Sequence, residues 1–235
     1  MSASRLAVWL CVLQCAGALA APVTVDVGHN LQEPGATSAR GRGEFEFNRD
    51  LAREIGGALT KRGHAPVVSG DDGNAAQPPA RRVKGVNTAL LLSVHHDSVQ
   101  EFLLTPWEFE GRKQRYSDRF SGFSLFVSRD NPRVGESLKC ASAIGAALRG
   151  AGFTPSLYHA DRQYGENRPF ADKDNGVHYF DNLAIVRRSQ VPAVLFEAGV
   201  IVNRDEELRM RDPAVRAKIA NAVADGVTAC LGGKP

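Results

Sequence analysis

Two short histidine motifs hold the side chains best suited to chemistry in this sequence. His29 follows Asp26-Val-Gly28, and the pair His95-His96 follows Ser93-Val94. Each motif comes directly after an apolar stretch typical of a strand, and α/β sheets bind ligands just beyond the carboxyl ends of strands. Gly28 lets the backbone turn sharply before His29. Two imidazoles that meet at one edge of a sheet predict a metal site.

Three glutamates are candidate acidic partners of these histidines. Glu44 begins a predicted helix, Glu46 lies two residues further on, and Glu197 ends the apolar run Ala193-Val-Leu-Phe. A carboxylate at the end of such a run is costly to bury unless it is paired or binds a metal. A catalytic zinc needs three protein ligands, and a further carboxylate to move protons, so these residue types together predict a zinc hydrolase. On spacing alone, the choice between the two helix glutamates, and between the two adjacent histidines, stays open.

The elements that position these motifs alternate between strand and helix patterns. This alternation predicts a single α/β domain with a mostly parallel twisted sheet and helices on both faces. The expected strands cover 23–27, 65–69, 89–94, 122–128 and 192–197, and the expected helices cover 44–61, 80–87, 137–149 and a last helix that begins at Asp212-Pro213. Apolar residues recur at helical intervals in the first of these helices, at Phe47, Leu51, Ile55 and Leu59.

Two stretches fit neither the helical nor the strand period. We expect 99–121 and 161–181 to be long loops, the first rich in charged and aromatic residues. We expect His159 and His178 to lie in loops, and we interpret them as surface histidines. Asp26 and Asp97 are either surface carboxylates or groups that orient a ligand imidazole through its second ring nitrogen.

Composition limits the possible functions. The chain has 235 residues, of which 43% are hydrophobic, enough for one sizeable core. Its 29 basic and 26 acidic residues give a net charge of +3, and the basic residues are scattered. This balance excludes a typical nucleic-acid-binding protein.

The first twenty residues differ from the rest of the chain. Arg5 is followed by the apolar run 6–13 and then by Ala18-Leu-Ala20, a pattern typical of a secretory signal peptide that is cleaved near Ala20. We therefore expect a signal peptide over 1–20 and a catalytic domain over 21–235, periplasmic or secreted. No later apolar run is long enough to predict a transmembrane segment.

Two cysteines, Cys140 and Cys230, follow this leader. An oxidising compartment favours a disulfide between them. Both also fall on the apolar sides of predicted helices, so two separate buried thiols are the alternative. Their spacing is not that of zinc ligands.

Taken together, the motifs resemble those of the zinc-dependent N-acetylmuramoyl-L-alanine amidases of the amidase-3 family, from about Val23 to Leu231. The residues that carry the resemblance are Asp26-Val-Gly-His29, Pro34-Gly-Ala36, Glu44 with Asn48, Arg82, Ser93-Val-His95, Leu183 to Arg187, Pro192 to Gly199, and Asn203. The resemblance implies that His29, Glu44 and His95 bind Zn²⁺ and that Glu197 is the catalytic carboxylate. It also implies hydrolysis of the amide between N-acetylmuramic acid and L-alanine in peptidoglycan. The sequence identifies no protein activator.

The sequence departs from the family pattern outside the implied ligands. Asn30-Leu31 stands where glycines often follow the first histidine, and Glu33 stands where an aspartate is expected. His96-Asp97 replaces a continuation to asparagine, and Val200 replaces a phenylalanine. These changes concern contacts to substrate and leave the zinc set intact.

Two other functions use the same residues. A related zinc exopeptidase needs an arginine to bind a free carboxylate, and Arg187 or Arg188 is available for this. A wall-binding protein that keeps zinc without turnover is the non-catalytic alternative. Glu197 argues against it, because a protein that only binds has no use for a proton-transferring carboxylate.

Overall fold

The computed structural model describes residues 21–74 and 85–232. The strands are β1 (Pro22–Val27), β2 (Ala65–Ser69), β3 (Leu90–Asp97), β4 (Thr105–Phe109), β5 (Arg112–Tyr116), β6 (Ser124–Val127), β7 (Phe170–Asp172), β8 (Val177–Tyr179) and β9 (Ala193–Val200). The helices are α1 (Glu44–Lys61), α3 (Val134–Gly150), α4 (Ala184–Arg187), α5 (Arg204–Arg211) and α6 (Pro213–Cys230), with short 3-10 turns at η1 (Glu101–Leu103) and η2 (Tyr158–Ala160). No helix in these ranges is long and apolar enough to cross a membrane.

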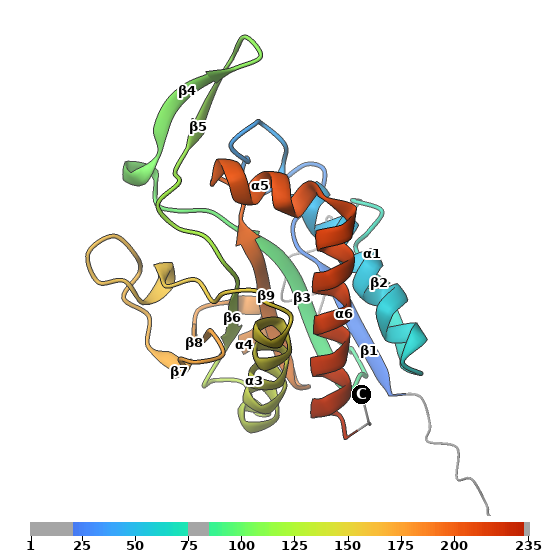
Figure 1. The fold of residues 1–235 in the computed structure, drawn as a ribbon. Coiled ribbons are helices and arrows are strands. Elements are labelled where there is room, and N and C mark those ends of the chain that lie inside the picture. The colour runs from blue at the N-terminus through green and yellow to red at the C-terminus, as the bar shows by residue number, and fades with distance from the viewer. Residues whose placement is uncertain (1–20, 75–84, 233–235) are drawn as a thin grey trace, which may run out of the picture.

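Seven strands form one sheet in the order β2-β1-β3-β9-β6-β8-β7, and β4 and β5 form a separate hairpin that projects from the body of the protein (Figure 1). Pairing is parallel from β2 through β1 and β3 to β9, and again between β6 and β8. Within the described part of this seven-stranded sheet, only β6–β9 and β7–β8 are antiparallel. The carboxyl ends of β1, β3 and β9 therefore lie at one edge of the sheet, and the predicted α/β fold is confirmed.

The two faces of the sheet are covered unequally. Leu90, Leu92 and Val94 of β3 pack with α1, α3 and α6 in the larger core. Leu91 points to the other face of the sheet, where it packs with the short helix α4 and with Leu195 in a smaller core. Because side chains alternate along a strand, His95 and Glu197 lie on the same face as Leu91 and Leu195. The candidate site therefore lies on the face of the sheet that the short helix α4 covers.

Local signals fix the long helices. α1 begins and ends where the apolar period predicted, and Asp212 caps α6 by accepting a hydrogen bond from the backbone nitrogen of Ala214 at 2.8 Å. Cys140 of α3 and Cys230 of α6 form a disulfide, with their Cα atoms 4.9 Å apart. The predicted disulfide is confirmed, and the alternative of two free thiols is wrong.

The two expected loops contain strands, so those predictions are wrong. The segment 99–121 holds the β4–β5 hairpin, whose turn is made by Glu110 and Gly111 with φ of 50° and 72°. Two positive φ angles in succession match the twist of a tight hairpin. The segment 161–181 holds β7 and β8, and α5 was not predicted.

Some predictions lie outside the described residues. The signal peptide over 1–20 is one of them, and Arg82 is another. Of the helix expected over 80–87, residues 85–87 are not helical and the others are not described.

Candidate metal centre

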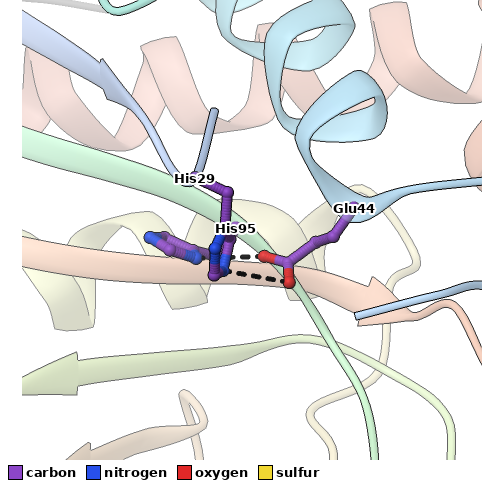
Figure 2. A group of neighbouring side chains, drawn as sticks. All are labelled: His29, Glu44 and His95. Atoms are coloured by element: carbon purple, nitrogen blue, oxygen red, sulfur yellow. Dashed lines mark hydrogen bonds and ion pairs between the residues drawn. The ribbon is translucent and has the colours of Figure 1, made fainter. Parts of the chain in front are cut away.

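The three residues expected to bind zinc come from three elements that meet at the carboxyl edge of the sheet. His29 follows β1, Glu44 is the first residue of α1, and His95 lies in β3 (Figure 2). One nitrogen or oxygen atom from each lies within 4.8 Å of the others. Glu44 Oε1 is 3.0 Å from His95 Nδ1, and Glu44 Oε2 is 3.1 Å from His29 Nε2. The sequence motifs therefore converge on one cluster.

Two glycines make room for this cluster. A Cβ atom at Gly28 would lie 2.4 Å from the ring of His95, and one at Gly35, where φ is +78°, would lie 2.4 Å from Glu44 Oε2. The sharp turn expected at Gly28 is made by His29 itself, with φ of 64°. A positive φ at a residue other than glycine is uncommon and marks a conformation held by its surroundings. Gly28 is required for close approach.

The carboxylate of Glu44 is held in its ionised form. Asn48 Nδ2 donates to Oε1 at 3.0 Å, and the backbone nitrogen of Ala36 donates to Oε2 at 3.0 Å. Burial raises the pKa of Glu44, but hydrogen bonds with His29 and His95 outweigh burial and hold this pKa well below its usual value. An ionised carboxylate between two imidazoles is a donor set that zinc prefers.

The neighbouring candidates lie elsewhere. His96 points to the opposite face, where its Nδ1 is 2.8 Å from Asn48 Oδ1, and burial lowers its pKa to about 3. Glu46 is exposed and pairs with Arg42 at 3.1 Å. The structure thus brings His95 and Glu44 into the cluster and leaves out His96 and Glu46.

Glu197 lies beside this cluster. The parallel register places Glu197 of β9 opposite His95 of β3, and the antiparallel register places Ser124 of β6 on its other side. The residue is partly exposed, but its Oε2 is buried and has no hydrogen-bond partner among the described residues. Burial, and then the charges of Asp97 and Glu44, raise the pKa of Glu197 well above its usual value. A carboxyl group with a raised pKa can both accept and return a proton near neutral pH.

His159, which the sequence analysis interprets as a surface histidine, is buried and pairs with Asp97, two residues after His95. His159 is 5% exposed, and its Nε2 lies 2.6 Å from Asp97 Oδ2 while its Nδ1 lies 2.8 Å from Glu166 Oε2. Glu166 also pairs with Arg168. Burial lowers the pKa of His159, but the two carboxylates outweigh burial and raise this pKa to about 9. We call Asp97, His159, Glu166 and Arg168 the buried ion chain.

His178 is also buried, so the interpretation of both histidines as surface residues is wrong. It is 0% exposed in β8 and stacks on Phe170 with ring centroids 4.4 Å apart, and burial lowers its pKa to about 3. Its position between apolar neighbours, Val177 and Tyr179, is a strand signal that could have been used. Asp97 is buried as well, and its imidazole partner is His159 rather than an expected ligand.

Asp26 is the remaining carboxylate singled out from the sequence. It is buried in β1, so it is not a surface group, and its Oδ2 accepts a hydrogen bond from Ser93 Oγ at 2.7 Å. This bond ties β1 to β3 just below the cluster. It helps to fix the two strands from which His29 and His95 extend.

The fold and the site together define a class. This is an α/β protein whose parallel sheet brings two imidazoles and a carboxylate together at its carboxyl edge, beside a second carboxyl group with a raised pKa. The family model described as N-acetylmuramoyl-L-alanine amidase (Amidase_3) matches residues 23–229. The chain therefore belongs to the amidase-3 family of N-acetylmuramoyl-L-alanine amidases.

Individual relatives are more distant. The chain is 26% identical over 248 residues to a probable N-acetylmuramoyl-L-alanine amidase, AmiB, of Haemophilus influenzae, covering 92% of this chain and 54% of that protein. It is 23% identical over 207 residues to a probable cell wall amidase, LytH, of Staphylococcus aureus, covering 87% of this chain and 56% of that protein. The chain thus spans about half the length of these curated relatives.

A solved structure supports the fold over nearly the whole chain. The crystal structure of the N-acetylmuramyl-L-alanine amidase Ami1 from Mycobacterium smegmatis has a TM-score of 0.72 to this chain at 22% sequence identity. The match covers 91% of this chain and 98% of that one. At this identity the match shows a shared fold.

Proposed function

We propose that this protein is a zinc-dependent N-acetylmuramoyl-L-alanine amidase, which hydrolyses the amide between N-acetylmuramic acid and L-alanine in peptidoglycan. The observation that carries the proposal is the convergence of His29, Glu44 and His95, with Glu197 next to His95 in register. Family membership supports the substrate class, and the names of the curated relatives agree with it.

Three residues are proposed to hold the zinc ion. His29, Glu44 and His95 supply two imidazoles and one carboxylate. Gly28 and Gly35 lie against His95 and Glu44, where a side chain on either glycine would clash with these two ligands. Bound zinc supplies Lewis-acid polarisation and lowers the pKa of water. The side chains of His29 and His95 are 33% and 14% exposed, which leaves the cluster open to substrate.

Glu197 is proposed to move the proton. Its carboxylate accepts the proton of the attacking water, and the protonated carboxyl group then donates to the departing nitrogen of L-alanine. The raised pKa of Glu197 suits both steps, because the group must hold a proton between them. Lacking a hydrogen-bond partner among the described residues, Oε2 is free to take this proton.

We further propose that the chain acts outside the cytoplasm, in the periplasm or after secretion. The leader expected over 1–20, cleaved near Ala20, leaves the catalytic domain over 21–235. The disulfide between Cys140 and Cys230 supports an oxidising compartment. The curated relatives named as cell wall amidases agree with this location.

The alternatives receive less support. A zinc exopeptidase would use Arg187 or Arg188 to bind a free carboxylate. Arg187 is the last residue of α4 and Arg188 follows it, and Asn131 donates to the backbone oxygens of Val186 and Val191 on either side of them, next to the start of β9. Glu197 lies further along β9, toward the opposite edge of the sheet. A non-catalytic wall-binding protein leaves the raised pKa of Glu197 without a purpose.

One experiment separates these functions. Metal analysis of the purified chain is combined with mass spectrometry of peptidoglycan incubated with it. We expect one zinc per chain and release of peptides that begin with a free L-alanine amine. Release of single amino acids would favour the exopeptidase, and retention on insoluble peptidoglycan without soluble products would favour the wall-binding protein.

A further inference from the structure

A groove lies between the β4–β5 hairpin and residues 35–38, which belong to the segment between β1 and α1. Its volume is about 610 Å³, and Gly35 and Ala36 line one end. The backbone nitrogen of Ala36 donates to Glu44 Oε2 at 3.0 Å, and a Cβ atom at Gly35 would lie 2.4 Å from the same oxygen. The groove therefore starts against a proposed zinc ligand and runs from there toward the hairpin.

The hairpin is a fixed wall of this groove. Trp107 Nε1 donates to the backbone oxygen of Ala39 at 2.9 Å, and the guanidinium of Arg40 lies over the Trp107 ring, 5.6 Å from its centroid. Arg40 is in turn paired at 2.8 Å with the fully buried carboxylate of Glu207 in α5. These contacts hold one face of the hairpin against the body of the protein.

The opposite face of the hairpin carries positive charge. Because side chains alternate along β5, Lys113 and Arg115 point away from the face that carries Trp107, and both line the groove. Lys113 has no ion pair within 4.0 Å among the described residues, although the exposed Glu108 lies opposite it in register. Arg115 pairs with Glu101 at 3.2 Å, but both side chains are exposed, so this pair is weak. The groove offers two cations that an anionic ligand can use.

We propose that this groove binds the peptide side of the substrate, with Lys113 and Arg115 contacting a free carboxylate of an acidic peptide. The proposal rests on the proposed amidase function, since it takes the scissile amide to lie at the zinc site. Two cations favour a peptide carboxylate over the uncharged hydroxyl and acetamido groups of a glycan. A volume of about 610 Å³ is within the range of sites that hold a small ligand.

The test uses two soluble muropeptides that share the same scissile amide. One carries a free α-carboxylate on the second residue of its peptide, and the other carries a carboxamide there. For the full chain with Lys113→Ala and Arg115→Ala together, we expect KM for the carboxylate substrate to rise about tenfold, with kcat unchanged. KM for the carboxamide substrate is expected to stay at the wild-type value.

Arg112→Ala is the matched control. Arg112 lies in the same strand, pairs in register with Phe109 on the other face, and does not line the groove. Arg112→Ala removes one positive charge, as each half of the double variant does, at the position next to Lys113, and we expect it to change neither KM. An equal rise in KM for both substrates, or no rise in the double variant, would overturn the proposal.

A binding measurement separates this proposal from the proposed function. The probe is the free peptide that begins with L-alanine and carries the same carboxylate, titrated calorimetrically into the wild type and the double variant. If the double variant binds the peptide more weakly than the wild type, the groove proposal is supported even when no muropeptide is cleaved. In that case only the proposed amidase function fails. Cleavage of both muropeptides without any effect of Lys113 or Arg115 sinks only the groove, and absence of both cleavage and peptide binding sinks both proposals.

Discussion

Two clusters of histidines and carboxylates lie beside Glu197, and their charges are arranged in opposite ways. In the candidate metal centre one carboxylate, Glu44, is shared by two imidazoles. In the buried ion chain one imidazole, that of His159, is shared by the carboxylates of Asp97 and Glu166. The first cluster has more imidazoles than carboxylates, whereas the second has more carboxylates than imidazoles.

The ratio of imidazoles to carboxylates determines which of the two clusters suits a metal ion. Ligand nitrogens must be unprotonated, so a cluster whose imidazole has its pKa raised to about 9 competes poorly for a metal ion. In the buried ion chain, the carboxylates of Asp97 and Glu166 already pair with cations, namely protonated His159 and Arg168. The candidate metal centre has one carboxylate and partly exposed imidazoles, so a metal cation would complete it. Histidine and acid content alone does not make this distinction.

The largest expected effect tests the metal side of the comparison. His29→Ala, Glu44→Ala and His95→Ala should each lose zinc and activity, beyond the roughly 10–100-fold affinity loss typical of groups that only support ligands. Chelation of wild-type protein should have the same effect, reversed by added zinc. Metal stoichiometry and amidase activity are the measurements.

Glu46→Ala is the control for these ligand variants, because Glu46 lies on the same helix and outside the cluster. It should keep zinc and activity, and His96→Ala should keep zinc. A zinc-replete Glu44→Ala together with a zinc-poor Glu46→Ala would reverse the assignment.

The next effect concerns Glu197, whose pKa is raised by burial and then by the charges of carboxylates from both clusters. Glu197→Gln keeps the shape of the side chain but cannot hold the transferred proton. We expect it to fold and bind zinc while kcat falls by about a hundredfold or more. Steady-state kinetics and metal analysis on one preparation check this, and a metal-free variant would make Glu197 a ligand instead.

A moderate effect on stability is expected from His159→Asn. It leaves the buried Asp97 without its cation, at a cost of about 3 kcal/mol in the free energy of unfolding. The folded pKa of His159, about 9, lies above the ordinary value, so this stabilisation is fully present below about pH 6.5 and is lost as the pH rises through about 9. Urea unfolding at both ends of this range is the measurement. If His159→Asn instead loses zinc and keeps its stability, His159 belongs to the metal centre and the distinction between the two clusters is wrong.

The smallest effect is expected at the outer end of the buried ion chain. Glu166→Gln removes one of the two carboxylates that raise the pKa of His159, so this pKa should fall below about 9. Because the Glu166 side chain is 28% exposed, we expect a cost of only about 1 kcal/mol. An NMR titration of the His159 ring measures the pKa directly, and an unchanged value would show that Asp97 alone sets it.

The candidate metal centre could be predicted because its residues sit at the ends of regular elements. The apolar runs before His29, His95 and Glu197 mark strands, and Glu44 opens a helix of clear period. Parallel pairing then places these ends at one edge without any knowledge of side-chain contacts. The choice of Glu44 over Glu46, and of His95 over His96, came from the family resemblance and not from spacing. The sequence could not show that Gly28 serves the ring of His95, because that contact is between strands far apart in the chain.

The buried ion chain could not be predicted in the same way. His159 is 62 residues from Asp97, and its burial depends on η2 and the irregular segment after it. Other misses had usable signals. Asn203, with three acidic residues starting two positions later at Asp205, is a helix-start pattern, and the structure has Asn203 capping α5. Glu110-Gly111 between two runs with aromatic residues was the signal for the β4–β5 hairpin.

The disulfide between Cys140 and Cys230 has a consequence for proteolysis. The closed loop contains Glu197 and the exposed segment around Arg162, whereas His29, Glu44 and His95 lie before it in the chain. Exposed irregular segments are preferred sites of protease cleavage. A single cut after Arg162 would divide the ligands from Glu197 in sequence, but the two fragments would stay covalently joined through α3 and α6. On a gel, such nicked protein would run as one band until it is reduced.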